Sequence, residues 1–446
     1  MLNVLANQTY RHLFLAQVIA LVGTGLATVA LGLLAYNLAG ANAGEVLGTA
    51  LAIKMIAYVG VSPIAAAFAE RLPRKTMLIG LDLVRAGVAL ALPFVSQVWQ
   101  VYILVFVLQS ASAGFTPTFQ ATIPDVLPDE KDYTHALSLS RLAYDLENVA
   151  SPMLAAALLT VIDFHNLFAG TVMGFLASAA LVQSVTLPTP TPAAPRGIYD
   201  RITRGTRIYF ATPRLRGLLA ISFAVACAGA MVIVNTVVLV QARFGLTARE
   251  TAMALGAFGG GSMIAALAMP RLLEQLSDRT FMITGAGIAG FGLFLGVIAP
   301  SYYSLFALWV LIGFGYALAQ TPSGKLLRRS AHAEDRPSLF AAQFALSHTC
   351  WLATYPLAGW LGSRVGLPAT FGVLAVMALS AAFAASRLWS HLDPAEIEHI
   401  HTTLKPSDEH LRGAAQEGKA FRHSHTFIID SAHPEWPNQY PAQATR

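Results

Sequence analysis

The chain has 446 residues, of which 55% are hydrophobic and only 12% are charged, and its formal net charge is +5. Soluble domains carry roughly a quarter charged residues, so this composition excludes an ordinary soluble protein. The apolar runs are continuous over about 20 residues, which is the length of a membrane-spanning helix, whereas barrel strands alternate over about 10. The sequence therefore predicts an all-α, polytopic membrane protein.

Twelve predicted spans follow one another along the chain, six in each half. Their ranges are 12–38, 46–69, 76–95, 99–120, 133–160, 166–186, 215–242, 250–270, 280–299, 303–321, 337–361 and 367–388. Between the halves the chain is first Pro-rich and then basic, which indicates a linker on the membrane surface. The predicted units are residues 1–186, the linker 187–213, residues 214–389 and a polar tail, 390–446.

The basic residues predict which way the chain crosses the membrane. Lys and Arg accumulate in cytoplasmic loops. With the N-terminus in the cytoplasm, the far-side loops hold only Arg243, Arg249 and Arg364 of the 29 Lys and Arg. We therefore expect both termini in the cytoplasm and the protein in the cell (inner or plasma) membrane.

The two halves share landmarks in the same order. The charged turn ERLPRKT at 70–76 recurs as EQLSDRT at 274–280, and TPT at 116–118 recurs as TPS at 321–323. Six spans is an even number, so the halves have the same orientation and form parallel repeats. Such repeats are related by an axis along the membrane normal, with a site near the midplane between them.

These features resemble the major facilitator superfamily. Its loop motif G-x-x-x-D-R-x-G-R-[RK] is similar to A-x-x-x-E-R-x-P-R-K at 66–75, and its antiporter motif G-P-x-x-G-G to S-P-M-L-A-A at 151–156. Leu15-Ala16-Gln17, Asp82-x-x-Arg85 and Ile123-Pro124-Asp125 are similar to the branch of drug/proton antiporters that contains macrolide-efflux, siderophore-export and nickel-resistance proteins. The resemblance implies twelve helices in two six-helix bundles.

Ionisable side chains inside the predicted spans point to coupling chemistry. At mid-bilayer such a group costs about 2.5–3.5 kcal/mol on insertion scales, so each needs a reason. Six of them lie in the first half: Lys54, Asp82, Arg85, Arg141, Asp145 and Glu147. We expect the residues that couple transport to an ion gradient to lie in the first half. The second half is expected to contribute mainly to the shape of the transport pathway.

Two pairs among these residues have helical spacing. Asp82 and Arg85 are three apart, and Arg141 and Asp145 are four apart, so each pair shares one helix face and can neutralise itself. Each pair is either a structural ion pair or part of the coupling site.

Glu147 has no partner on its own helix face. It lies two residues past Asp145 and so points in another direction, and Lys54 is the remaining base. A buried carboxylate beside a lysine can hold or release a proton as its surroundings change. We predict that Lys54 with Glu147 or Asp145 forms an ion- or substrate-sensitive switch.

Uncharged polar residues are expected to line a central cavity. The resemblance implies that the first, fourth, seventh and tenth spans face it. The candidates are Gln17, Gln109, Asn235, Tyr316 and Gln320. Hydrogen bonds between helices, worth about 0.6 kcal/mol each, are the alternative role.

The first charged turn is predicted to form a cytoplasmic latch between the halves. Glu70 would face the positive N-terminus of a helix in the other half, and the basic residues would pair with acidic residues of the next loop. The latch candidates are Glu70, Arg71, Arg74, Lys75 and Asp125.

The tail is rich in histidine. Seven of the twelve histidines lie between residues 391 and 446, including the His-x-His pairs His399/His401 and His423/His425. Spaced imidazoles among carboxylates suit Ni²⁺, Cu²⁺ or Zn²⁺. A disordered polar tail is the alternative.

Together these features predict a secondary active transporter that exports a small toxic compound by alternating access, with protons as the coupling ion. Three alternatives stay open: a nickel/cobalt-type exporter that uses the tail, an uptake transporter, and a non-transporting sensor or assembly factor on the same fold. No nucleotide loop or nucleophile–base pair occurs, so we predict no enzymatic activity and no cofactor. The expected partners are the substrate, protons and the lipid bilayer, without nucleic acid, and the expected state is a monomer.

Overall fold

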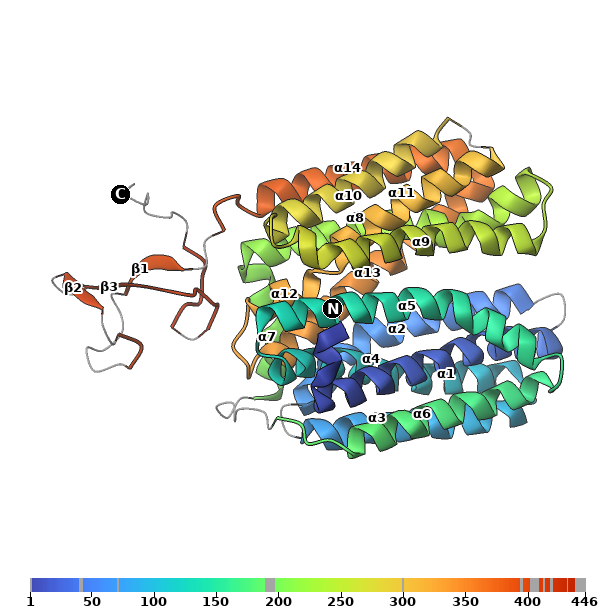
Figure 1. Ribbon diagram of the computed structural model, residues 1–446, viewed down its shortest axis with the longest axis horizontal. Helices are drawn as coiled ribbons and strands as arrows, with labels where there is room; N and C mark the ends of the chain where they lie inside the picture. The colour runs from blue at the N-terminus through green and yellow to red at the C-terminus, as the bar shows by residue number, and fades with distance from the viewer. Residues whose placement is uncertain are drawn as a thin grey trace.

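The computed structural model consists of two helical bundles and a small β-structure beyond one end of them (Figure 1). It describes residues 2–39, 43–69, 72–188, 197–298, 301–393, 396–401, 409–411, 414–417, 420–430 and 432–437. The short η1 (Leu2–Ala6) and the tail lie at the same end of the bundles, which we call the terminal face. Glu70 and Arg71 of the predicted latch lie outside the described residues.

The first bundle contains the six predicted helices. They are α1 (Gln8–Ala39), α2 (Ala43–Ala69), α3 (Arg74–Ala91), α4 (Val98–Val126), α5 (Glu130–Leu158) and α6 (Leu167–Gln183), with η3 (Leu92–Phe94) and η4 (Phe164–Asn166) as short 3₁₀ turns. Side-chain hydrogen bonds fix the start of some of these helices. For example, Asp129 accepts from the backbone N–H groups of Lys131 and Asp132, both at 2.9 Å, which starts α5.

The second bundle repeats this arrangement. It contains α8 (Pro213–Val237) with the π-helical η5 (Val238–Arg243), α9 (Ala248–Leu272), α10 (Asp278–Gly296), α11 (Tyr302–Gln320) with the short α12 (Ser323–Arg328), α13 (Arg336–Arg364) and α14 (Leu367–Leu388). Gly261 lets α9 approach α11 closely, because a Cβ there would lie 2.1 Å from the Val310 carbonyl oxygen. The predicted membrane fold of twelve helices in two bundles is confirmed, and the tail adds a small β-sheet to it.

Ten helical segments of the described chain are long and apolar enough to cross a membrane. The two long helices outside this set are α5 and α13, each of 29 residues. Both carry polar side chains and pack against the opposite bundle. Their polarity is therefore directed at a protein interface rather than at lipid.

Equivalent pairs of helices are in contact in the two bundles. Within the first bundle α1 packs on α6 and α2 on α4, and in the second α8 packs on α14 and α9 on α11. Between the bundles α2 packs on α13 and α5 packs on α9. The second span thus meets the eleventh and the fifth meets the eighth, so the two interfaces are equivalent copies, as expected for parallel repeats about one axis.

The linker contains a helix that the sequence analysis did not predict, α7 (Ile198–Ala211). It packs on α13 and α2. Gly205 permits this, because a Cβ at that position would lie 1.9 Å from the backbone oxygen of Ser338. The linker therefore touches both bundles at the terminal face.

The tail folds into a three-stranded antiparallel sheet in the order β1-β3-β2. The strands are β1 (Ile397–His401), β2 (Ala415–Glu417) and β3 (Ala420–His425), and η6 (Glu409–Leu411) precedes β2. Ile397, Phe427 and Ile429 are buried and belong to the same apolar cluster as the core of the second bundle. The described part of the tail is therefore ordered and attached to that bundle.

Candidate functional site

A polar network joins the two bundles at the middle of α5. Arg141 donates to both carboxylate oxygens of Asp145, at 2.6 and 3.1 Å. Ser262 on α9 donates to Asp145 at 2.6 Å and accepts from Arg141 Nε at 2.9 Å. The Arg141 guanidinium also lies over the ring of Tyr316 on α11, 4.8 Å from its centre. A coupling pair and a cavity residue of the sequence analysis therefore meet across the interface, together with Ser262, which was missed.

Glu147 lies one half-turn beyond this network, half-buried on another face of α5. Its carboxylate is close to α1, since a Cβ on Gly25 would lie 2.7 Å from Glu147 Oε1. Lys54 lies within electrostatic range of Glu147, but no ion pair joins them among the described residues. Instead the Lys54 ammonium lies 5.5 Å from the ring centre of Tyr58. The predicted switch pair is thus near in space but not bonded.

His348 on α13 is an ionisable group that the sequence analysis overlooked. It packs edge-on against Tyr58 of α2, with ring centres 4.7 Å apart, and its Nδ1–H donates to the Phe344 carbonyl at 2.7 Å. The second half therefore supplies a titratable side chain next to Lys54, not only shape. A single histidine in an apolar helix gives little signal by itself, because only the fold brings it to the interface.

Asp82 and Arg85 form a buried ion pair inside the first bundle. Ser178 on α6 donates to Asp82 at 2.8 Å, and the Arg85 guanidinium lies 4.0 Å from the ring centre of Phe115 on α4. Because every contact named here stays within one bundle, this pair holds α3, α4 and α6 together.

We expect Asp82→Asn to destabilise the protein without a specific effect on coupling. Removing one partner of a buried ion pair leaves the other charge uncompensated and costs about 3–5 kcal/mol. The melting temperature in detergent should fall, and transport should fall only in proportion to folded protein. The double variant Asp82→Asn/Arg85→Met should recover part of the loss. A stable Asp82→Asn protein with altered pH dependence would contradict this structural role.

The predicted cavity residues differ in their hydrogen bonding and in whether they line a cavity. Gln17 and Asn235 make interhelical hydrogen bonds, Gln17 accepting from Ser140 at 3.1 Å and Asn235 donating to the Ala358 carbonyl at 3.2 Å. Gln320 lines a small cavity in the second bundle, and its buried Oε1 has no hydrogen-bond partner among the described residues. Gln109 is half-buried on α4. Gln320 is therefore the uncharged candidate best suited to meet a ligand.

The described latch residues centre on Asp125, at the end of α4. This carboxylate pairs with Arg74 at the start of α3 and with Arg336 at the start of α13 in the other bundle. Lys75 instead donates to the Gln183 carbonyl at 2.6 Å, and within the described part of the chain it has no ion pair with an acidic side chain, contrary to the prediction. We define Arg74, Asp125 and Arg336 as the latch; Arg336 was missed.

Other polar contacts close the same face of the molecule. Lys325 on α12 contacts Glu130 on α5 at 2.6 Å and Asp278 on α10 at 3.1 Å. Arg204 on α7 pairs with Asp335 at 3.0 Å. The two bundles are thus held together by charge pairs at the terminal face.

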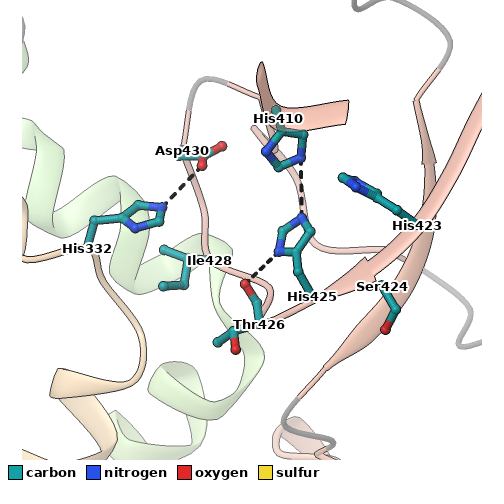
Figure 2. Close-up of a pocket in the computed structure, with 8 residues that line it drawn as sticks. All are labelled: His332, His410, His423, Ser424, His425, Thr426, Ile428 and Asp430. Carbon is teal, nitrogen blue, oxygen red and sulfur yellow. Dashed lines mark hydrogen bonds and ion pairs between the residues drawn. The ribbon is translucent and has the colours of Figure 1, made fainter. Parts of the chain in front are cut away.

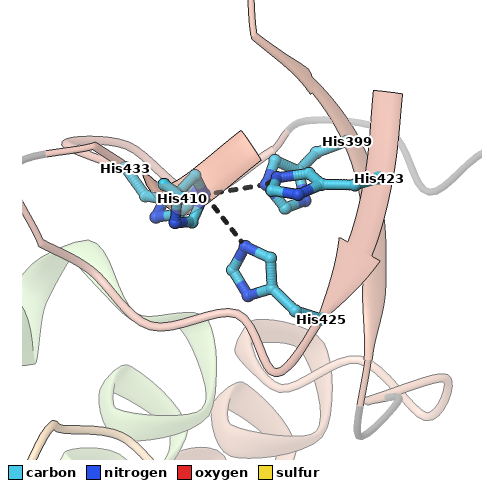
Figure 3. A group of neighbouring side chains, drawn as sticks. All are labelled: His399, His410, His423, His425 and His433. Carbon is cyan, nitrogen blue, oxygen red and sulfur yellow. Dashed lines mark hydrogen bonds between the residues drawn. The ribbon is translucent and has the colours of Figure 1, made fainter. Parts of the chain in front are cut away.

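The four predicted tail histidines come together, joined by two more. The residues of each His-x-His pair point to the same face of a strand, and the strand register aligns His399 with His423. The remaining rings are His410 of η6 and His433, neither of which stood out in the sequence. The donor atoms of five rings lie within 4.8 Å of one another (Figure 3).

The Nε2 atoms of these rings converge on one point. His399 Nε2 lies 3.1 Å from His401, 3.1 Å from His423 and 2.9 Å from His433, and His410 Nε2 lies 3.2 Å from His401 and 3.3 Å from His425; these are all Nε2 to Nε2 distances. Burial and the neighbouring imidazoles lower the pKa of His399 and of His423 to about 4. Both rings are therefore neutral at pH 7.

A family model supports the same conclusion as the helix arrangement. The Major Facilitator Superfamily model matches residues 13–241 and 218–429. The chain belongs to the major facilitator superfamily. It is accordingly a multi-pass membrane protein of a transporter family.

Relatives and solved structures agree with this membership. Macrolide efflux protein A of Streptococcus pyogenes is 28% identical over 155 residues, which is 32% of this chain and 38% of that protein. The match therefore spans well under half of the relative. The structure of a human organic anion transporter has a TM-score of 0.74 at 12% identity, over 85% of this chain and 99% of that one. A bacterial homologue of the iron transporter ferroportin, in its outward-facing state, has a TM-score of 0.67 at 15% identity, over 85% and 98%.

Proposed function

We propose that this transporter exports a small toxic organic compound by alternating access, driven by the proton gradient. The observation that carries the proposal is the bonding of Arg141 and Asp145 of one bundle to Ser262 of the other. A charged pair at a bundle interface costs desolvation unless its partners stay in place. When the bundles move relative to each other, the contacts of Arg141 and Asp145 with Ser262 change. The conformational change is therefore linked to the hydrogen bonding and charge of this pair.

The latch supplies the second requirement of alternating access. Its contact between Asp125 and Arg336 lies at the terminal face and joins the bundles through side-chain charges rather than through the apolar core. This contact can open while each six-helix bundle stays intact. From the distribution of Lys and Arg, we infer that this face is cytoplasmic.

Glu147 is the best candidate for the transported proton. It is half-buried, carries no ion pair among the described residues and lies close to α1 and to the charge of Lys54. Asp145 is already bonded to Arg141 and Ser262. A carboxylate without a fixed partner can change its protonation with less rearrangement than one inside a network.

Two observations favour an organic cargo over a metal ion. The relative named above is a macrolide efflux protein. Within the described residues, the group of His, Cys, Asp or Glu side chains that could hold an ion lies in the tail, outside the spans. We therefore assign the central pathway to organic compounds and consider the tail separately.

We expect Glu147→Gln to uncouple transport from the proton gradient. In proteoliposomes, a macrolide probe should still exchange across the membrane at equal concentrations, because the cavity is unchanged. Accumulation driven by an imposed pH gradient should be lost. Lys54→Met should shift the pH dependence of transport, because it removes the charge that acts on Glu147.

Ser140→Ala is a matched control, since it alters a polar contact on the same helix without removing a charge. Normal gradient-driven accumulation in Glu147→Gln would assign the proton to another residue, and loss of both exchange and accumulation would indicate a structural role for Glu147.

A further inference from the structure

The six clustered imidazoles of the tail, which exclude His391, are arranged as the corners of an octahedron. For each ring, four of the other five have centres 4.7–5.1 Å away. The fifth ring is then its opposite, and the opposite pair His399 and His410 has centres 6.4 Å apart. Rings that were merely stacked would not have this pattern of four near rings and one far ring around every member.

The nitrogen distances fit one metal ion at the centre. Six donors about 2.1 Å from an ion lie about 3.0 Å apart along each edge of an octahedron, whereas four donors of a tetrahedron lie about 3.4 Å apart. The measured Nε2 separations run from 2.9 to 3.3 Å. They agree with the octahedral edge.

Hydrogen bonds at the outer nitrogens orient three of the rings. The Nδ1 atoms of His399 and His425 lie 2.9 and 2.8 Å from the carbonyl oxygens of Ile397 and Thr426, and His433 Nδ1 lies 2.9 Å from Asp430 Oδ1. These oxygens can only accept, so each Nδ1 carries the hydrogen, and the neutral ring presents a bare Nε2. Metal-binding histidines typically donate their other N–H to a carbonyl or carboxylate in this way.

Bare Nε2 atoms that face one another require a cation. His399 and His433 both point lone pairs at the centre, with their Nε2 atoms only 2.9 Å apart. With both rings neutral, neither Nε2 can donate to the other, so a hydrogen bond between neutral rings does not explain the approach. A proton could bridge one such pair at a time, whereas a metal ion at the centre satisfies all six nitrogens together.

We propose that the tail of this transporter holds one divalent first-row transition-metal ion in an octahedral site of six histidines. Its ligands are His399, His401, His410, His423, His425 and His433. Zn²⁺ generally prefers four ligands and Cu²⁺ a tetragonal site. Affinity for nitrogen ligands rises from Mn²⁺ through Fe²⁺ and Co²⁺ to Ni²⁺, so Ni²⁺ is the preferred ion.

The small size of the tail gives the metal a structural purpose. The sheet has three short strands, and structures of this size generally need a metal or a disulfide to fold. Both cysteines of the chain are buried in α8 and α13, so they are not part of the tail. A metal that binds only the folded form stabilises it.

The site is also tied to the transport bundles. Asp430, which accepts from His433, lies 3.3 Å from Nε2 of His332 in the connection between α12 and α13 (Figure 2). Arg214 at the start of α8 donates to the Phe427 carbonyl at 3.3 Å and contacts Asp393 at 3.1 Å. The metal site is thus fixed to the terminal face, although it lies outside the spans.

The test uses the full-length protein, purified without a polyhistidine tag, stripped of metal with a chelator and dialysed against Ni²⁺. We expect one Ni²⁺ per chain, and X-ray absorption should show six nitrogen neighbours. Co²⁺ in place of Ni²⁺ should give the weak visible absorption of an octahedral complex. An intense tetrahedral spectrum, or four nitrogen neighbours, would overturn the six-histidine assignment.

Variants localise the bound ion. His423→Ala/His433→Ala should abolish tight Ni²⁺ binding, whereas His391→Ala, in the same tail but outside the cluster, should leave it unchanged. Asp430→Asn keeps all six ligands and should weaken binding about 10- to 100-fold. Equal Ni²⁺ binding by the wild-type and double-variant proteins, or several weakly bound ions per chain, would refute the proposal even if a variant tail failed to fold.

Discussion

Arg141→Met is expected to abolish transport and to destabilise the interface between the bundles. The guanidinium neutralises Asp145, bonds Ser262 and covers the ring of Tyr316. Asp145 is only 3% exposed, so its carboxylate would be left buried and uncompensated, at a cost of about 3–5 kcal/mol. The measurement is substrate exchange in proteoliposomes, together with the melting temperature.

Three further variants separate charge from contact. Arg141→Met/Asp145→Asn removes both charges and should recover most of the stability but not the transport. Ser262→Ala removes only the hydrogen bonds across the interface, so it should keep the fold and alter the rate. Tyr316→Phe keeps the ring over Arg141 and should have a small effect. Full transport by the neutral double variant would show that the pair is structural.

Asp125→Asn should open the latch. The carboxylate pairs with Arg74 and with Arg336 of the other bundle. Hydrogen bonds to charged groups contribute about 1.5–3 kcal/mol each, so losing the contact between the bundles should raise the population of the state open at the terminal face by at least tenfold.

A cysteine introduced at Ser62 reports this opening. Ser62 is fully buried and donates to the Ala341 carbonyl of the opposite bundle at 3.2 Å. In a background where Cys227 and Cys350 are replaced by alanine, Ser62→Cys should react slowly with a maleimide and at least tenfold faster when Asp125→Asn is added.

Asp129→Asn is the matched control for this experiment. It removes the same charge four residues further along the chain, but Asp129 starts α5 rather than joining the bundles, and asparagine is an equally good cap. Glu274→Gln breaks an exposed pair with Lys131 and should also have little effect. Labelling that is as slow in Asp125→Asn as in these controls would show that the latch does not hold the terminal face closed.

The sequence alone determined the architecture, because the rules that govern spans are local. Twenty apolar residues cross the bilayer whatever surrounds them, and the recurrence of the 70–76 turn at 274–280 revealed the duplication. The pairs Asp82/Arg85 and Arg141/Asp145 were accessible for the same reason, since helical spacing brings them together. The His-x-His pairs were visible as a spacing of imidazoles, whereas the strands that carry them were not predicted.

Only the tertiary structure decided which of these local pairs cross an interface. Helical spacing is the same for Asp82/Arg85 and Arg141/Asp145, yet the contacts of the first pair stay within one bundle and those of the second reach Ser262 in the other. Arg336, His348, His410 and His433 gave no signal of their own because their partners are distant in the chain. Helical or strand spacing brings neighbouring side chains of one segment together. The packing of distant segments decides which residues of the other bundle or of the tail those side chains contact.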